Sequence, residues 1–205
     1  MSNYIFSYKS KPEEYKPRAV EIGKEIRAFY DQGRMDIVGS AFIYSGMVKV
    51  LARMNTLCID YNSILTQPET MAQWLNLRPV VESIALVMEN LCPLDAGIVF
   101  SEAYLNKSIE RWVSDIKNDL NVSIAWIIQY GGDGISRRKN LSPGQTRQIT
   151  NAVKKHGHAA ILSTIFRSCV SWVKLCDKVF LPAYMKYKNG NINTLSAAFS
   201  KIARR

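Results

Sequence analysis

Apolar residues recur at helical spacing along almost the whole of this 205-residue chain, and strict apolar–polar alternation is rare. The pattern is clearest between residues 158 and 180, where the apolar positions are Ile161, Leu162, Ile165, Phe166, Cys169, Val170, Trp172, Val173, Cys176 and Val179. Residues three and four apart share a face in a helix. The sequence therefore predicts a mainly α protein, organised as a single helical domain with extended N- and C-terminal arms.

Proline, glycine and capping residues mark where the predicted helices begin and end. They place helices at about residues 12–32, 35–55, 68–77, 79–91, 101–119, 142–155 and 158–180, with a short one after Thr194. Gly157 is expected to break or bend the helix between residues 142–155 and 158–180. Residues 124–130 fit either a helix or a strand. Ser142-Pro143-Gly144-Gln145 predicts a capping box. Gly39 and Gly46 are costly inside a helix and indicate close packing at both positions.

The two ends of the chain differ from its middle. Residues 1–11 place apolar side chains among polar ones, and residues after 186 begin with a polar breaker in which Asn189-Gly190 predicts a turn. We therefore expect an N-terminal arm at 1–11, a helical core at 12–185 with a basic part at 131–185, and a C-terminal arm at 186–205.

The net charge of +10 is concentrated in the last third of the chain. Residues 131–205 hold 14 lysines and arginines and only two acidic residues, Asp133 and Asp177, whereas residues 1–130 hold 13 basic and 15 acidic residues. Such an asymmetry favours a polyanionic partner, either nucleic acid or an anionic membrane surface. A charge bias that only keeps the protein in solution is the alternative.

No residue pattern predicts an enzyme, a cofactor or a metal site. The four cysteines show no CxxC pair and are expected to be buried free thiols. They are Cys58, Cys92, Cys169 and Cys176. His156 and His158 are the only histidines, too few for a zinc site, and no nucleophile accompanies them. Asp115 and Asp119 lie one helical turn apart, a pattern typical of a solvated helix face.

A glycine-rich turn precedes the first basic cluster. Residues 131–134 read GGDG and follow the apolar run 124–130. The turn resembles the GGDG(T) nucleotide-binding turn of lipid kinases and NAD kinases, although Ile135 replaces the usual threonine. This resemblance implies backbone amides that cradle phosphates after a strand. Helical patterns on both sides of the turn favour a flexible loop instead.

The basic residues after this turn fall into three settings that suit a phosphate backbone. The loop carries Arg137, Arg138 and Lys139, the next helix carries Arg147, Lys154 and Lys155, and the last long helix carries a stripe of Arg167, Lys174 and Lys178. Ser142 and Gln145 would hold the start of the helix that carries Arg147. If the two helices are neighbours, these cations line one groove and bind single-stranded RNA in a salt-sensitive, sequence-independent way.

Three tyrosines flank the basic region and are candidates to stack on unpaired bases: Tyr130, Tyr184 and Tyr187. Each is also explained as an ordinary edge of an apolar core. The sequence contains no zinc-finger spacing, no GXXG clamp and no other base-reading signature. Binding by charge and stacking is therefore the predicted mode.

Apolar arms on polar tethers can dock on an identical neighbour, which produces a ring or a helical filament. The self-association candidates are Tyr4, Ile5, Phe6 and Tyr8 in the N-terminal arm and Leu195, Phe199 and Ile202 in the C-terminal arm. A small helical core with a basic groove and exchangeable arms is similar in organisation to RNA-virus nucleoproteins and filamentous coat proteins. That similarity implies a coat for RNA in the host cytoplasm and the virion. The alternative is that both ends pack on their own subunit.

Two further observations concern membranes. The N-terminus has no apolar stretch long enough for a signal peptide, and apolar runs such as 84–88 are too short to span a bilayer. We therefore expect a cytoplasmic protein without stable membrane insertion. The alternative function is a basic helical adaptor that binds acidic proteins or anionic membrane surfaces, with residues 195–205 as the candidate membrane-surface helix.

Overall fold

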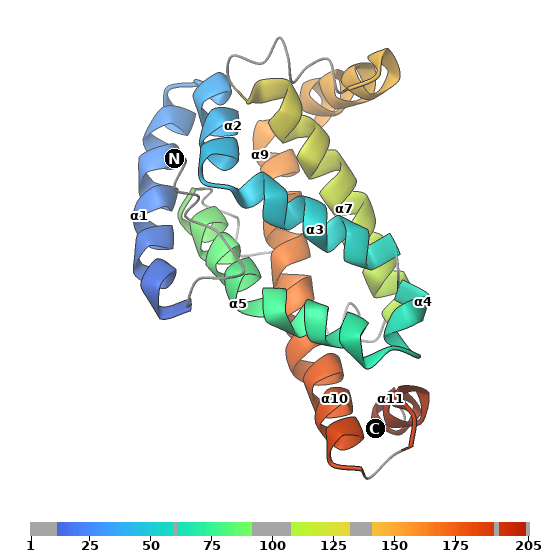
Figure 1. Cartoon of the computed structure of the whole chain (residues 1–205). Helices are drawn as coiled ribbons and strands as arrows, with labels where there is room; N and C mark the ends of the chain where they lie inside the picture. The colour runs from blue at the N-terminus through green and yellow to red at the C-terminus, as the bar shows by residue number, and fades with distance from the viewer. Residues whose placement is uncertain (1–11, 60, 92–107, 132–140, 191–192, 204–205) are drawn as a thin grey trace.

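The computed structural model describes residues 12–59, 61–91, 108–131, 141–190 and 193–203 (Figure 1). Every regular element within these ranges is a helix, which confirms the predicted mainly α fold. The elements are α1 (Pro12–Asp31), α2 (Met35–Tyr44), α3 (Met47–Ile59), α4 (Tyr61–Ile64), α5 (Pro68–Leu91), α7 (Ile109–Tyr130), α9 (Pro143–Leu175), the π-helical turn η1 (Cys176–Phe180), α10 (Leu181–Lys188) and α11 (Leu195–Ala203).

Helices α5, α7 and α9 form the centre of the molecule. Helix α1 packs on α5, α2 and α3 pack on α7, and α7 lies along α9 (Figure 1). Buried apolar side chains from these helices join in one core, whose largest fully buried members are Trp74, Trp126 and Trp172. Aromatic side chains of this size bury a large apolar area. The core therefore fixes α7 and α9 relative to each other, and α9 carries most of the described RNA-binding candidates.

The segment predicted as one helix over 35–55 is two helices, α2 and α3, bent by 71° at their junction. Gly46 lies at this junction with a φ of +83°, the left-handed region that commonly follows a helix. At Gly39, by contrast, an added Cβ would lie 2.5 Å from the carbonyl carbon of Tyr130, so glycine lets α2 approach the end of α7. The prediction of close packing is therefore confirmed for Gly39, and Gly46 serves as a turn.

The helices predicted over 68–77 and 79–91 are one helix, α5, with Pro79 inside it. Proline cannot donate a helical hydrogen bond, and α5 bends in its middle (Figure 1). One turn earlier, the Trp74 carbonyl accepts hydrogen bonds from Trp172 Nε1 at 3.3 Å and from Cys176 Sγ at 3.6 Å. The Trp74 and Trp172 rings also stack with centroids 3.6 Å apart. Packing across the core thus holds together a helix that the local sequence would divide.

The C-terminal part of the chain is more continuous than predicted. Residues 124–130, for which helix and strand were both possible, are the last turns of α7. The helix predicted to end at 180 passes through η1 and continues as α10 to Lys188. The predicted turn follows, with Gly190 at a φ of +67°, and the predicted cap of α11 is present because Thr194 Oγ1 accepts from the Ala197 amide at 3.2 Å.

One described stretch, Pro143–Lys188, is long and apolar enough to cross a membrane, and the bent pair α2 and α3 passes the same test when taken together. Length and composition are the only basis for both. Half of the most apolar window of the first stretch is buried inside the molecule. Packing in the core therefore accounts for much of its apolar character.

Candidate nucleic-acid interface

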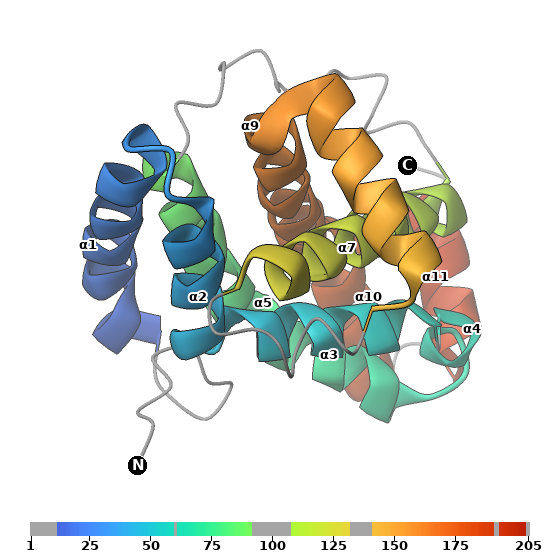
Figure 2. The same ribbon diagram turned by 90° about the horizontal axis from the view of Figure 1, so that it is seen from above.

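Gly157 divides α9 into two halves with different surroundings. Its φ of +77° and ψ of 166° are non-helical, which confirms the predicted break. The first half (143–156) lies at the upper end of the molecule in Figure 1, and Figure 2 shows it running in a different direction from the second half (158–175). The 33 residues of α9 include five basic residues and no acidic residue.

Three of these basic residues form a cationic face on the first half: Arg147, Lys154 and Lys155. Together with Asn151 they make up the α9 basic face, and all four side chains are exposed. Their spacing of i, i+4, i+7 and i+8 puts them on one side of the helix, over roughly 12 Å. None of the three cations forms an ion pair among the residues that the structure describes.

Several other cations of the molecule lie next to carboxylates. The ion pairs are Arg18 with Glu21 and Glu25, Arg27 with Asp31, Lys16 and Arg78 with Glu82, Arg78 with Asp177, and Arg167 with Asp119. A carboxylate neighbour competes with any incoming anion for the cation. The α9 basic face is therefore a part of the described surface where three exposed cations lie together without an ion pair to an acid.

The predicted capping box fixes the start of this half. Ser142 Oγ accepts from the Gln145 amide at 3.2 Å, and the Ser142 amide donates to Gln145 Oε1 at 2.9 Å. Ile149, only 4% exposed, anchors the opposite side of the helix in the core. Gln129 Nε2 of α7 donates to Thr150 Oγ1 at 3.2 Å. The α9 basic face is thus presented by a helix that is held at its start and along its inner side.

The kink lies beside an aromatic corner formed by Trp126, Tyr130 and His158. Trp126 Nε1 donates to His158 Nδ1 at 3.1 Å, and the His158 ring meets the Tyr130 ring edge-on at 4.9 Å. Burial lowers the pKa of His158, so the imidazole is neutral near pH 7 with Nδ1 as acceptor. His156 is exposed. Tyr130, predicted to stack on bases, is half-buried here and ends α7 next to the kink.

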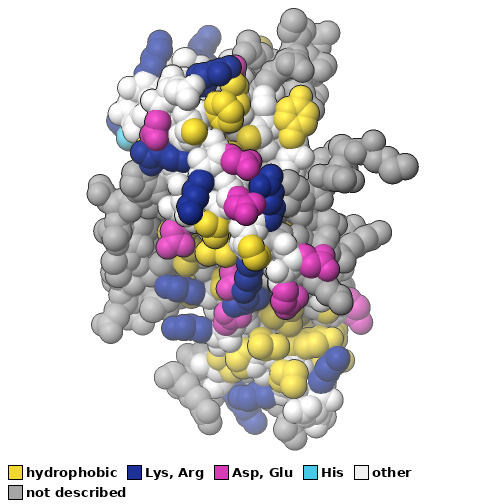
Figure 3. All heavy atoms as spheres, turned by 90° about the vertical axis from the view of Figure 1, so that its left-hand side faces the viewer, with side chains coloured by type: hydrophobic (Ala, Val, Ile, Leu, Met, Phe, Trp, Pro, Cys, Tyr) yellow, Lys and Arg dark blue, Asp and Glu magenta, His cyan; other side chains and the backbone are white. Residues whose placement is uncertain are grey.

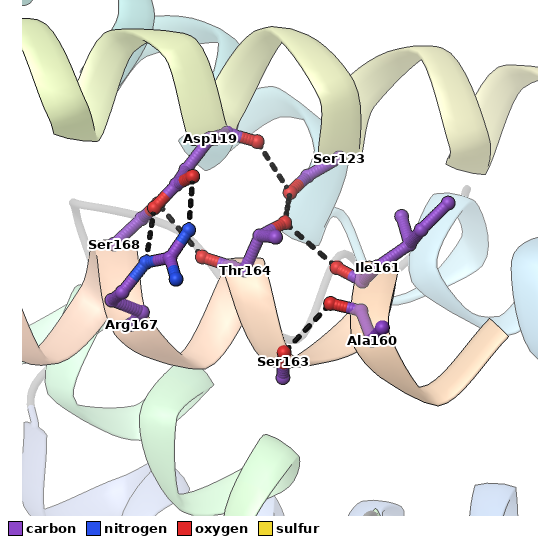
Figure 4. Close-up of polar contacts among 8 residues, drawn as sticks. All are labelled: Asp119, Ser123, Ala160, Ile161, Ser163, Thr164, Arg167 and Ser168. Carbon is purple, nitrogen blue, oxygen red and sulfur yellow. Dashed lines mark hydrogen bonds and ion pairs between the residues drawn. The ribbon is translucent and has the colours of Figure 1, made fainter. Parts of the chain in front are cut away.

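The second half of α9 uses its polar side chains to pack against α7 (Figure 4). Arg167 Nε donates to Asp119 Oδ2 at 2.6 Å, and its Nη2 bonds the other carboxylate oxygen. The Asp119 side chain is 14% exposed, so the interpretation of this residue as part of a solvated face is wrong. Arg167 lies in an ion pair between helices, where its charge is already balanced.

A hydrogen bond between two hydroxyl groups joins the same two helices one turn along. Ser123 Oγ is 2.7 Å from Thr164 Oγ1, and Ser123 is fully buried (Figure 4). Sequence reasoning missed Asp119, Ser123 and Thr164 as partners across the helix pair. The available signal was a polar serine on the apolar side of α7, between Leu120 and Ile127.

Lys174 and Lys178 lie farther along the chain, roughly 25–30 Å of helix beyond the kink. Burial, and then the charge of Lys178, lower the pKa of Lys174. Tyr184 and Tyr187 follow on α10 and are half-buried, with Lys188 Nζ 5.2 Å from the Tyr184 ring centroid. The described candidate residues therefore do not form the single groove that the sequence predicts. One group lies on the first half of α9 and at the end of α7, and the other lies on the second half of α9, η1 and α10.

The loop cations Arg137, Arg138 and Lys139 lie outside the described residues, as do Gly132 to Gly134. The residues that flank this segment are described: Gly131 ends α7, and Leu141 precedes the cap of α9. The run before the glycines is helical. The strand implied by the resemblance to lipid and NAD kinases is therefore replaced by α7.

The C-terminal arm folds back on its own subunit. Leu195 and Phe199 are 2% and 5% exposed, the Phe199 ring lies 5.9 Å from the Phe180 ring, and Ile202 is half-buried. This arrangement is the alternative that the sequence left open, and it argues against self-association through these side chains. The N-terminal candidates Tyr4, Ile5, Phe6 and Tyr8 lie outside the described residues.

Comparison with known proteins gives no relative. No protein-family model, no curated protein and no solved structure matches this chain.

The three described cysteines lie in the core. Cys58, Cys169 and Cys176 are buried free thiols, as predicted, and Cys92 lies outside the described residues. Burial raises the pKa of Cys58 to about 12, opposed in part by the charge of Lys117, and also raises those of Cys169 and Cys176. A thiol with a raised pKa is a poor nucleophile at neutral pH. Among the described residues, no group of three His, Cys, Asp or Glu side chains could hold a metal ion.

Proposed function

We propose that this protein is a nucleoprotein that binds single-stranded RNA, without regard to its sequence, through the α9 basic face. The observation that carries the proposal is a set of exposed cations, Arg147, Lys154 and Lys155, on one side of a helix that contains no acidic residue. The capping box and the buried Ile149 hold this helix in place. Phosphates therefore meet charges that are already positioned.

The chemistry of this face suits a phosphate backbone better than base edges. Each lysine or arginine that neutralises a phosphate releases condensed counterions, which gives affinity that depends on salt and not on sequence. The accessible part of Tyr130 beside the kink offers a ring on which an unpaired base can stack. This combination favours a single strand over a duplex.

We also propose that the protein self-associates along the RNA. The N-terminal arm is the proposed contact, because the buried Leu195 and Phe199 already occupy the C-terminal arm within its own subunit. Deletion of residues 1–11 should reduce the oligomer, measured by light scattering, to the monomer. An unchanged oligomer after the deletion would remove the arm from this role.

Salt dependence tests the binding mode. Three phosphate contacts predict that the logarithm of the affinity falls against the logarithm of the salt concentration with a slope of about −2, and six contacts, if the loop takes part, give about −4. Between 50 and 200 mM salt the affinity should therefore fall by roughly 20- to 300-fold. Oligomers of different sequence should give the same slope. A flat response, or tighter binding to duplex than to single strands, would contradict the proposal.

Charge reversal tests the location. The variant Arg147→Glu, Lys154→Glu, Lys155→Glu should bind RNA about 100-fold more weakly, with its helical content unchanged. The matched control reverses three exposed cations elsewhere, Lys24, Arg34 and Arg111, with the same change in net charge. Equal losses of RNA affinity in both variants would show that binding depends on net charge alone.

A further inference from the structure

Helix α10 exposes two large apolar side chains on one face. Leu181 is 46% exposed and Met185 is 49% exposed, and residues four apart lie on the same side of a helix. The other large exposed apolar side chains among the described residues are Tyr44, Ile59 and Val122, each on a different helix. The pair on α10 is therefore the one place in the described part of the chain where such side chains come together on one helix.

Cations surround this pair. Lys178 and Lys188 are exposed, and Lys186 is half-buried. The chain contains no acidic residue after Asp177. Asp177 itself is engaged, because Arg78 donates two hydrogen bonds to its carboxylate at 3.0 and 2.9 Å. We call Leu181, Met185, Lys178, Lys186 and Lys188 the α10 face.

The α10 face lies at a tip of the molecule. Helices α10 and α11 form the lower end of the structure in Figure 1, opposite the first half of α9. Figure 3 shows hydrophobic side chains gathered over this lower end, with lysine or arginine side chains beside them and acidic side chains along their upper edge. Helix α11 packs on α10 but leaves Leu181 and Met185 about half exposed.

We propose that the α10 face docks on the surface of an anionic phospholipid bilayer. Leu181 and Met185 enter the boundary between head groups and acyl chains, while the lysines meet lipid phosphates and carboxylates. Charge complementarity selects the occupant, since Lys178, Lys186 and Lys188 flank the apolar pair and the acid nearest to it in the sequence, Asp177, is already paired. Tyr184, with Lys188 against its ring, adds an aromatic residue of the kind enriched at membrane interfaces.

The shape of the face favours a bilayer over an acidic helix. A helical partner docks in a groove and needs anchors at successive turns. The α10 face offers two exposed apolar side chains, and shallow contact with a lipid surface requires no groove. The inference does not depend on RNA binding, because the α10 face and the α9 basic face lie at opposite ends of the molecule (Figure 1).

Vesicle flotation with the nuclease-treated full chain tests the inference. Vesicles of phosphatidylcholine mixed with phosphatidylserine should retain the protein at low salt, and pure phosphatidylcholine vesicles should not. Leu181→Ser with Met185→Ser should lower retention by at least about fivefold, and Lys178→Glu with Lys188→Glu should do the same. The control pair Tyr44→Ser and Ile59→Ser removes two more exposed apolar side chains elsewhere and should leave retention unchanged.

The affinity for single-stranded RNA should be unaffected by the α10 pair, which separates this inference from the proposed function. No retention on either vesicle, equal retention on both, or full retention of the α10 variants would overturn it. So would displacement of the protein from vesicles by a soluble acidic helical peptide at stoichiometric concentration, which would identify a protein partner. Circular dichroism of each variant confirms that the fold is intact.

Discussion

The two halves of α9 carry basic residues of the same kind and put them to different uses. In the first half, Arg147 points into solvent with Lys154 and Lys155 and has no acidic neighbour among the described residues. In the second half, Arg167 closes an ion pair with Asp119 of α7. Gly157 separates the two settings. A count of basic residues along a helix therefore says little about binding until the packing of each half is known.

Replacement of one arginine in each half should give the largest difference in stability between the two halves. Arg167→Gln leaves the nearly buried Asp119 carboxylate without its cation and should cost about 2–4 kcal/mol of unfolding free energy, measured by urea denaturation. Arg147→Gln should change stability by less than about 0.5 kcal/mol but weaken RNA binding. The double variant Arg167→Gln, Asp119→Asn should recover part of the loss. A stability cost at Arg147 as large as that at Arg167 would contradict the division.

Gly157→Ala should be the next largest effect. A φ of +77° with ψ near 166° belongs to a region that essentially only glycine adopts, so alanine should cost about 1–3 kcal/mol. No side chain or backbone atom from a more distant part of the described chain lies within 4 Å of the added Cβ, so the cost arises from the local backbone conformation. Gly144→Ala, inside the first turn of the same helix, is the control and should be neutral or slightly stabilising. Equal thermal stability of the two variants would show that the kink is not required.

Ser142→Ala should have a smaller and local effect. Loss of the capping hydrogen bond should cost about 1 kcal/mol and increase amide hydrogen exchange in residues 144–146. RNA affinity should fall by a few-fold, because the helix that carries Arg147 is held less firmly. Ser163→Ala in the second half is the control. Faster exchange across residues 158–175 in the Ser142 variant would mean that the two halves are not independent.

The pH dependence contributed by His158 should be the smallest effect. Burial lowers its pKa in the folded protein, so the unfolded chain takes up a proton first as pH falls below about 6.5. The contribution of His158 to the free energy of unfolding is therefore fully present above about pH 6.5 and decreases as the pH falls toward the lower pKa of the folded state. Comparison of wild type with His158→Gln, and with exposed His156→Gln as control, isolates the slope. If the same dependence of stability on pH remains in His158→Gln, it arises from another group.

Local signals in the sequence predicted the parts of the structure that depend on neighbouring residues. Ser142, Pro143 and Gln145 form their capping box within one turn, and Gly157 needs no partner to stop a helix. Contacts between distant residues were not readable in this way. Arg167 and Asp119 are 48 positions apart, and a single sequence gives no sign of which cation will meet which acid. Pro79 ends an isolated helix but not α5, whose Trp74 carbonyl is bonded from α9.

For the candidate site, too, local spacing was predictable and contacts between distant residues were not. The positions of Arg147, Lys154 and Lys155 on one exposed face follow from helical spacing, which the sequence contains. The single groove fails because helix length separates Lys174 and Lys178 from that face and because an ion pair occupies Arg167. Folding of α11 onto α10 depends on Phe180 and Phe199, which meet only in the tertiary structure.

The most direct test of the account is to map where RNA touches the chain. Single-stranded RNA carrying 4-thiouridine, crosslinked by light and analysed by mass spectrometry, should label Tyr130 and residues 143–156. Labelling should be absent from residues 158–175. Crosslinks concentrated at Tyr184 and Tyr187, with none in the first half of α9, would contradict the assignment of the interface to the α9 basic face.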